Sequence, residues 1–325
     1  MKIDPTPERR FARGQEAESE LAANGPLSWT ECLKHLGRSE SEIMHRIANG
    51  RVYKAVSFGE RALVLELAAG AEAGGDPHIR WTTALRVGFP HGGDTPELRA
   101  AAADYVREWF GLDDNLQAFY DMARRDPVLA PAAAAHQGLR LIGIPDLFEA
   151  LVWSIIGQQI GLGFAYTLKK RLVEAYGEVL PVNTAAGEPP YRLFPRPARL
   201  AALNPDALRP LQFSVRKAEY IIGIARLIEG GRLCRSALLK LDEEEARAQL
   251  LAIRGVGAWT ADYVGMKCLR RPSAFPAADA GLHQALRREL KLGRKPLPAE
   301  IAQAAAPWRG HEAYATFYLW QSLLE

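Results

Sequence analysis

The sequence predicts an α+β fold in which a small antiparallel β-rich domain precedes a larger all-α body. Runs rich in β-branched and aromatic residues at 51–58, 61–69 and 79–89 are typical of strands. From about residue 96 onward, apolar residues recur at helical spacing, and glycine and proline separate the segments. We therefore expect a flexible polar tail at 1–25, a β-rich domain at 26–95 and a helical body at 96–325.

Composition narrows the class of protein. The chain has 325 residues, of which 48% are hydrophobic and 24% charged, as in ordinary globular proteins. The net charge of +3 is too small to indicate a nucleic-acid binder by itself, so any such argument needs local clusters. Cys32, Cys234 and Cys268 are too few and too far apart for a disulfide framework or a cysteine-rich metal site.

The sequence gives no sign of membrane insertion or export. It contains no run of 18 apolar residues, and its first 25 residues lack the apolar stretch of a signal peptide. We expect a cytoplasmic protein with no membrane partner.

Local signals place the elements of the N-terminal domain. Ser28 can cap a helix WTECLKHL that Gly37 ends. The runs 51–58 and 61–69 are joined by Gly59-Glu60, a two-residue turn that predicts a hairpin. The third run, 79–89, follows a glycine-rich loop. These elements predict a small antiparallel sheet with one covering helix.

The helical body is expected to consist of short helices with short connections. The segments with helical periodicity are 95–110, 147–177, 215–231, 243–253, 257–269, 281–290 and 313–324. A proline-rich segment at 183–200 interrupts them, and we expect it to be an irregular loop packed across the helices.

The most informative segment is QLLAIRGVGAWTADYVGMKCL, residues 249–269. A helix that ends near Ile253 is followed by the turn Gly255-Val256-Gly257, and a second helix begins at Ala258. The glycines permit positive φ and bare backbone, and Val256 can pin the turn between the helices. The exposed amides would form an anion site that suits a DNA backbone. An ordinary glycine-containing turn is the alternative.

The chain resembles the helix-hairpin-helix DNA glycosylase superfamily, and within it the bacterial DNA-3-methyladenine glycosylase II type. Besides the hairpin, the resemblance rests on FPAADAGLHQAL and on the segments at 139–160, 191–203, 211–231 and 306–324. It covers most of residues 96–325, whereas the N-terminal region matches by position and class only. The resemblance implies an active site in a cleft between helical subdomains.

The resemblance implies that Asp279 is the catalytic carboxylate. A carboxylate beside C1′ would stabilise the oxocarbenium-like sugar and orient the attacking water. Asp279 also stands where the helix 281–290 needs an N-cap, so a purely structural role is the alternative, and the two roles can coexist.

Trp259, Tyr263 and Trp320 match the aromatic base pocket of the family, in which ring faces attract a flipped, positively charged alkylated purine. Burial in an ordinary core is the alternative for each ring. Some relatives have Tyr directly after the catalytic Asp, and this chain has Ala280, which leaves the substrate range open. Bifunctional members have a nucleophilic Lys where this chain has Trp259, so the resemblance implies water as nucleophile and no lyase step.

The remaining contacts to DNA are also implied by the resemblance. Gln158 is the Gln of the GQ motif and Gln159 takes the position of the wedge, although both residues can simply end a helix. The backbone would be held by residues of the hairpin and of the preceding basic helix: Gly255, Val256, Gly257, Thr260, Arg216 and Lys217. The basic run Lys169-Lys170-Arg171 is expected near the same face, or as a solvated helix surface.

No cofactor is expected to be required. Hairpins of the family often bind a monovalent cation through carbonyl groups, which implies a structural Na⁺ or K⁺ site at Leu251, Ile253 and Val256. The leading hypothesis is therefore a monomeric glycosylase, associated with the bacterial nucleoid, that removes 3-methyladenine and 7-methylguanine from double-stranded DNA. The alternatives are a glycosylase for oxidised or deaminated purines and a non-catalytic DNA-binding hairpin protein.

Overall fold

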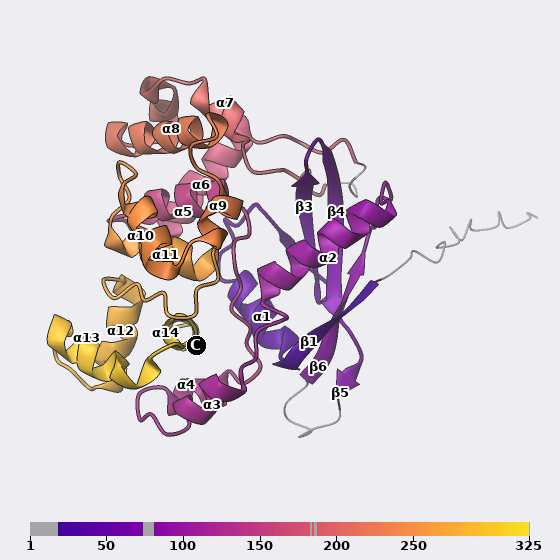
Figure 1. Ribbon diagram of the computed structural model, residues 1–325. Helices are drawn as coiled ribbons and strands as arrows, with labels where there is room; N and C mark the ends of the chain where they lie inside the picture. The colour runs from indigo at the N-terminus through magenta and orange to yellow at the C-terminus, as the bar shows by residue number, and fades with distance from the viewer. Residues whose placement is uncertain (1–18, 74–80, 183, 185–186, 325) are drawn as a thin grey trace, which may run out of the picture.

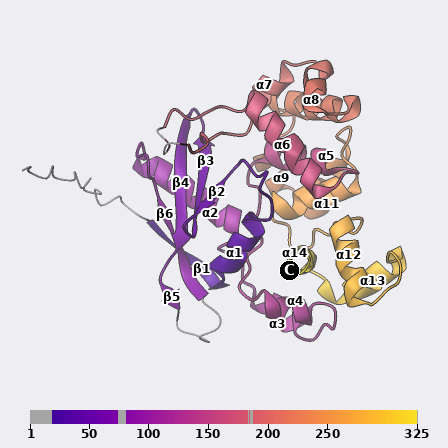
Figure 2. The same cartoon turned by 180° about the vertical axis from the view of Figure 1, so that it is seen from behind.

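The computed structural model describes residues 19–73, 81–182, 184 and 187–324. A β-sheet lies on one side of the molecule and a body of short helices on the other (Figure 1). The same arrangement seen from behind places α1 between the sheet and the helices (Figure 2). The predicted α+β class is confirmed.

The sheet is antiparallel, with the order β1-β6-β4-β3-β2 and the short β5 paired with β6. Its strands and first helix are β1 Ser19–Leu27, α1 Trp29–Leu36, β2 Arg46–Ala48, β3 Arg51–Phe58, β4 Arg61–Ala69, β5 Glu72–Ala73 and β6 Trp81–Gly88. Phe58 pairs with Arg61, which confirms the two-residue turn, and Ser28 caps α1 by accepting a hydrogen bond from the Glu31 amide.

The predicted tail at 1–25 is wrong for its last seven residues. Residues 19–25 belong to β1, which pairs with β6 along most of its length. The segment SELAANGPL shows little apolar alternation, so its own pattern does not predict a strand. Its pairing with β6 makes it one. Residues 1–18 lie outside the described residues.

The helical body contains every periodic segment that the sequence predicted. The helices are α2 Pro96–Phe110, α3 Gln117–Ala123, α4 Ala130–Ala135, α5 Leu147–Gly157, α6 Leu162–Tyr176, α7 Pro197–Ala201, α8 Val215–Glu229, α9 Arg235–Lys240, α10 Glu243–Leu251, α11 Ala258–Lys267, α12 Ala280–Glu289, α13 Pro298–Ala305 and α14 Glu312–Gln321. In the described part of the chain, no helix combines the length and the apolar character needed to cross a bilayer.

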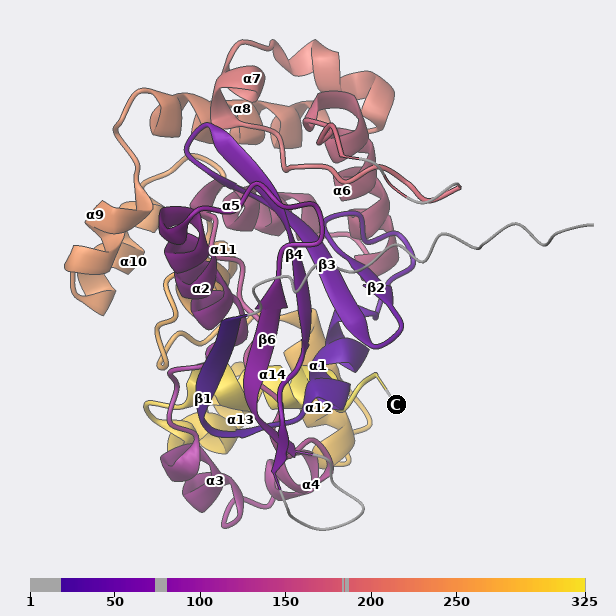
Figure 3. The same cartoon turned by 90° about the vertical axis from the view of Figure 1, so that its right-hand side faces the viewer.

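Two large hydrophobic cores divide the molecule. One core joins the sheet with α1 to α4 and α12 to α14, and the other joins α5 to α11. The first core therefore continues through residue 95, where the sequence analysis placed a boundary. Seen onto the sheet, α14, α12 and α11 lie behind it (Figure 3). Trp320 packs against both cores, so it marks their junction.

The proline-rich segment packs on the helices as expected through Phe194, whose ring lies 5.9 Å from that of Phe148 in α5, and it also packs on the sheet. Its described part, with Tyr191 and Leu193, packs on Ala55 and Val64 of the sheet. The segment ends in α7, which begins at Pro197, a residue whose fixed φ suits the first helical turn.

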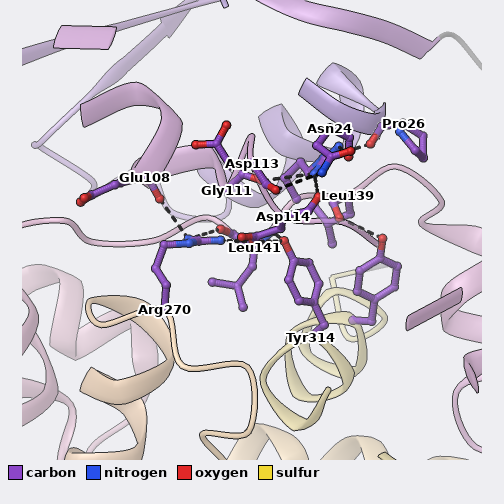
Figure 4. Close-up of polar contacts among 12 residues, drawn as sticks. Asn24, Pro26, Glu108, Gly111, Asp113, Asp114, Leu139, Leu141, Arg270 and Tyr314 are labelled. Atoms are coloured by element: carbon purple, nitrogen blue, oxygen red, sulfur yellow. Dashed lines mark hydrogen bonds and ion pairs between the residues drawn. The ribbon is translucent and has the colours of Figure 1, made fainter. Parts of the chain in front are cut away.

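A polar network ties the N-terminal strand to the helical body. Arg140 is fully buried, and its guanidinium donates to the carbonyl oxygens of Asn24, Pro26, Gly111 and Asp114 at 2.7–3.2 Å. In the same network, Arg270 donates to the Glu108 carbonyl and the Asp114 carboxylate, and the Tyr314 hydroxyl donates to that carboxylate at 2.6 Å (Figure 4). This network fixes α14 against the segment that follows α2.

Candidate active site

Asp279 and two indole rings form one hydrogen-bonded group at the junction of the two cores. The Trp320 Nε1–H donates to Asp279 Oδ1 at 2.7 Å, and the Trp259 Nε1–H donates to Asp279 Oδ2 at 2.9 Å. Oδ1 also accepts the Leu282 amide at 2.8 Å, so Asp279 is the N-cap of α12. The carboxylate is therefore both a helix cap and the acceptor that joins the two indole rings.

The turn before α12 fixes the position of this carboxylate. The Asp279 amide donates to the Pro276 carbonyl at 2.8 Å, which closes the turn. A Cβ atom at Gly281 would lie 3.1 Å from both Asp279 Oδ1 and the Trp320 ring. Glycine at this position lets the indole approach the helix backbone closely enough to reach the carboxylate.

The rings predicted for the base pocket lie side by side. The Tyr263 ring centroid is 5.5 Å from that of Trp259 and 6.1 Å from that of Trp320, with interplanar angles of 36° and 31°. The Trp153 Nε1–H donates to the Tyr263 hydroxyl at 2.8 Å. Burial raises the pKa of Tyr263 well above its usual range, so this wall is an uncharged phenol.

The hairpin has the predicted form. The helix α10 ends at Leu251, the turn follows, and α11 begins at Ala258 with no side-chain cap on its first amides. Val256 is buried between the helices, as expected. Gly255 has φ +94°, and a Cβ there would lie 2.3 Å from the Tyr220 ring. The turn therefore leaves open backbone amides at a helix N-terminus, the usual form of a phosphate site.

The Gly255→Ala variant is expected to have lower stability and weaker DNA binding. Its left-handed backbone costs a side-chain residue about 1–3 kcal/mol, and the new methyl group also clashes with Tyr220. Gly257→Ala is the matched control for folding, since φ is −95° and no atom lies within 4 Å of its added Cβ. Melting temperature and fluorescence anisotropy with duplex DNA measure both effects. Equal melting temperatures for the two variants would contradict the argument.

The two glutamines of the GQ motif have different environments. The Gln158 amide donates to the Gly255 carbonyl at 2.9 Å and to the Thr260 hydroxyl at 3.0 Å, so it braces the hairpin. Gln159 is exposed and has φ +57°. The first turn of α6, directly after this loop, carries two exposed apolar side chains that the sequence analysis did not single out, Leu162 at 52% and Phe164 at 43%.

The basic residues predicted for phosphate contacts are not equally available. Arg216 is exposed, whereas the Lys217 ammonium donates to the Ile156 carbonyl at 2.6 Å and burial lowers its pKa. Thr260 is buried, which leaves its backbone amide and not its hydroxyl for a phosphate. The expectation for Lys169 is wrong, because it is buried between Glu42 and Glu149 at 3.3 and 3.2 Å.

Three residues near Tyr263 were missed by the sequence analysis: His35, Arg38 and Lys267. They line a cavity together with Tyr263, Trp153 and Tyr166. Lys267 follows Trp259 and Tyr263 at intervals of four residues, so helical periodicity could have placed it on the same face. His35 and Arg38 come from the N-terminal domain, and no local pattern connects them with α11.

Two family models match the chain. Residues 152–309 match the HhH-GPD superfamily of base excision DNA repair proteins, and residues 18–146 match the AlkA N-terminal domain. The first match contains the hairpin and Asp279, and the second contains the whole sheet.

Named relatives are similar over much of the chain. It is 41% identical to the DNA-3-methyladenine glycosylase of Bacillus subtilis, over 90% of this chain and 92% of the relative. It is 33% identical to DNA-3-methyladenine glycosylase 2 of Escherichia coli, over 59% of this chain and 63% of the relative.

The fold is also that of solved glycosylases. A 3-methyladenine DNA-glycosylase from Archaeoglobus fulgidus aligns with a TM-score of 0.78 at 22% identity, over 93% of this chain and 97% of the other. The 8-oxoguanine glycosylase/lyase of Clostridium acetobutylicum, solved with double-stranded DNA, aligns with a TM-score of 0.67 at 19% identity, over 88% and 90%.

Proposed function

The chain belongs to the HhH-GPD superfamily of base excision DNA repair proteins, and on that premise we propose that it excises alkylated bases from DNA with Asp279 as catalytic carboxylate. Relatives named DNA-3-methyladenine glycosylase support the alkylated-base substrate and the hydrolase class. The observation that carries the site assignment is the pair of hydrogen bonds from the Trp259 and Trp320 indoles that fixes the Asp279 carboxylate between these rings.

Asp279 stabilises the positive charge that builds on the sugar as the C1′–N bond breaks. Three donors hold its carboxylate in one orientation, so little reorganisation is needed when the charge develops. The same carboxylate orients the attacking water and accepts its proton. Trp259, Tyr263 and Trp320 present ring faces to the flipped base, and each contact with a cationic purine contributes about 0.5–2 kcal/mol.

The enzyme uses water as its nucleophile and carries out no lyase step. Trp259 occupies the position of the lyase lysine in bifunctional members, and its indole bonds Asp279 instead. Borohydride treatment during the reaction is therefore expected to trap no protein–DNA adduct, because no Schiff base forms. The assay uses a duplex with one damaged base and resolves the products by denaturing electrophoresis. A borohydride-dependent adduct would overturn the monofunctional assignment.

DNA is held by the hairpin amides and by exposed Arg216. Gln159 fills the gap left by the flipped base. Its side chain is exposed and its backbone has the left-handed conformation, with φ +57°. Leu162 and Phe164 offer apolar surface beside it. We expect a monomer that works on the bacterial nucleoid, with an affinity for DNA that falls steeply with salt.

The hairpin suits a structural Na⁺ or K⁺. The carbonyl oxygens of Leu251, Ile253 and Val256 are the hard donors that such cations prefer. The Ile253 carbonyl accepts the Val256 amide at 3.0 Å, and its second lone pair remains for a cation. When bound, the cation would order the turn beside the phosphate, and the base-release chemistry does not involve it.

The test of the proposed function is base release from a panel of duplexes. The purified protein is incubated with DNA that contains 3-methyladenine, 7-methylguanine, hypoxanthine or 8-oxoguanine, and the released bases are quantified. Release of the two methylated purines is expected. Preferential release of 8-oxoguanine or hypoxanthine would favour the alternative specificity that Ala280 leaves open, and release of no base would leave only a DNA-binding role.

A further inference from the structure

A small cavity lies where the N-terminal domain meets the helical body. Its volume is about 50 Å³, and at about 10–15 Å³ for each water it takes a few waters but no base or nucleotide. Its wall combines side chains of α1 and β3 with side chains of α5, α6 and α11. Asp279, Trp259 and Trp320 are not part of this wall, so the cavity is separate from the candidate catalytic group.

The charged side chains of the cavity wall carry an excess of positive charge. The basic groups are Arg38, Lys54, Lys169 and Lys267, and the acidic groups are Glu42 and Glu149. The Lys169 ammonium lies 3.3 Å from the Glu42 carboxylate and 3.2 Å from the Glu149 carboxylate, so it already binds both acids. The wall therefore has two more basic groups than acidic groups.

The groups around Lys54 do not remove this excess. Asp146 is a further acidic neighbour of Lys54, but it does not line the cavity. Its carboxylate accepts the Glu149 amide at 2.6 Å as the N-cap of α5, and burial raises its pKa. The Lys54 ammonium donates to the Met44 carbonyl at 3.4 Å and lies 5.4 Å from the centroid of the Trp109 ring.

Lys267 brings a buried amine to the cavity without an acceptor for its hydrogens. The residue is 3% exposed, and its Nζ lies 4.6 Å from the centroid of the Phe317 ring. Within the described residues, no oxygen accepts a hydrogen bond from it. Burial, together with the charges of Arg38 and Arg270, lowers the pKa of Lys267 well below its usual range. A negative charge in the cavity would offset both effects.

His35 brings a ring nitrogen without a partner to the same cavity. Its ring centroid lies 4.5 Å from that of Phe317, the ring that Lys267 also contacts. The Gln321 amide nitrogen donates to Glu31 at 3.3 Å, so the Gln321 oxygen accepts the His35 Nδ1–H at 3.2 Å. His35 Nε2 is buried and has no hydrogen-bond partner among the residues that the structure describes. A buried polar atom of this kind normally has a water or an ion as its partner.

We propose that this cavity binds one small monovalent anion, held by Lys267 and Arg38. Chloride is the simplest anion of this class, and it is little larger than a water. The Arg38 Nη1 donates to the His35 carbonyl at 2.6 Å, which leaves other guanidinium N–H groups for the anion. Burial lowers the pKa of His35, so its Nε2 is an acceptor. A water that donates to both Nε2 and the anion satisfies this atom.

The anion joins two parts of the chain. His35 and Arg38 belong to the N-terminal domain, whereas Lys267 is the last residue of α11 in the helical body. A ligand that binds the folded protein and not the unfolded chain stabilises the fold by mass action. The free energy of unfolding is therefore expected to rise with chloride at constant ionic strength. This inference uses no step of base release, so it stands or falls independently of the proposed function.

The experiment measures the melting temperature as potassium chloride replaces potassium gluconate at one ionic strength. Gluconate is too large for a cavity of about 50 Å³, so the replacement tests a small anion. With a dissociation constant of about 10 mM, about 300 mM chloride is expected to raise the melting temperature of the wild type by about 3 °C.

Matched variants separate the site from general effects of salt. Lys267→Met is expected to lose the chloride-specific rise. Lys240→Met, which removes an exposed amine from the last turn of α9, is expected to keep it. Arg38→Met removes the second donor and is expected to need about tenfold more chloride for the same rise, and it carries the comparison if Lys267→Met does not fold. A rise of equal size in wild type, Lys267→Met and Arg38→Met would overturn the proposal.

Crystals of the wild type grown in bromide locate the anion directly. An anomalous peak is expected within hydrogen-bond distance of Lys267 Nζ and the Arg38 guanidinium. A cavity that contains water without an anomalous peak would overturn the proposal. A bromide peak without a chloride-specific rise of the melting temperature would mean binding at crystal concentration only, and this result would also overturn it.

Discussion

The Asp279→Asn variant is expected to lose excision of alkylated bases by about 10³-fold or more, because a developing positive charge loses its carboxylate partner. The amide is nearly isosteric, so the site keeps its shape. The measurement is the single-turnover rate on a duplex with one 7-methylguanine, with enzyme in saturating excess.

The same substitution also has a structural cost. Both indoles and the Leu282 amide donate to the carboxylate, and a carboxamide has only one oxygen to accept them. One indole N–H then faces an NH₂ group, which is expected to lower stability by about 1–3 kcal/mol. Asp206→Asn, an exposed acid paired with Arg209, is the control and should match wild type in both measurements.

The two readouts separate catalysis from capping. A variant that binds damaged DNA and melts only a few degrees low, yet excises nothing, supports the catalytic role. Excision at the wild-type rate would mean that Asp279 serves only as the N-cap of α12.

The Arg140→Leu variant is expected to lose about 3–5 kcal/mol of stability, because a fully buried charged donor is removed from the four carbonyl groups it bonds. Two of those carbonyls lie on β1 and two on the segment after α2. The variant therefore loses the hydrogen bonds that hold these two parts of the chain together. Denaturant unfolding followed by circular dichroism measures the change.

A surface arginine provides the comparison for Arg140. Arg209→Leu removes a side chain that is 66% exposed and is expected to change stability by less than about 0.5 kcal/mol. A similar small change for Arg140→Leu would mean that water replaces the lost donor at all four carbonyls. The melting curve is also expected to stay cooperative, since the network lies within one core.

Local signals were sufficient to predict most elements, whereas the catalytic role of Asp279 came from the family resemblance and stays a prediction. Ser28, Gly37 and the turn at Gly59 stand where the structure begins and ends its elements. The helical periodicity of 257–269 and 313–324 predicted α11 and α14. These predictions succeeded because each depends on neighbours within about one or two helical turns.

The features that the sequence did not predict depend on distant partners. The strand β1 exists because β6 pairs with it, and one cavity is lined by both Arg38 and Lys267, 229 positions apart in the chain. Lys169 belongs to a charge run that normally indicates a solvated face, but two glutamates from other segments bury it. Sequence position alone does not show such pairings.

Trp320 touches both cores and also bonds the carboxylate, so the chemistry depends on how the two halves of the molecule fit together. Loosening the first core, which contains none of the residues of the hairpin turn, is therefore expected to move this indole away from Asp279 while the turn keeps its form. Such a protein is expected to keep its affinity for DNA and to lose base release.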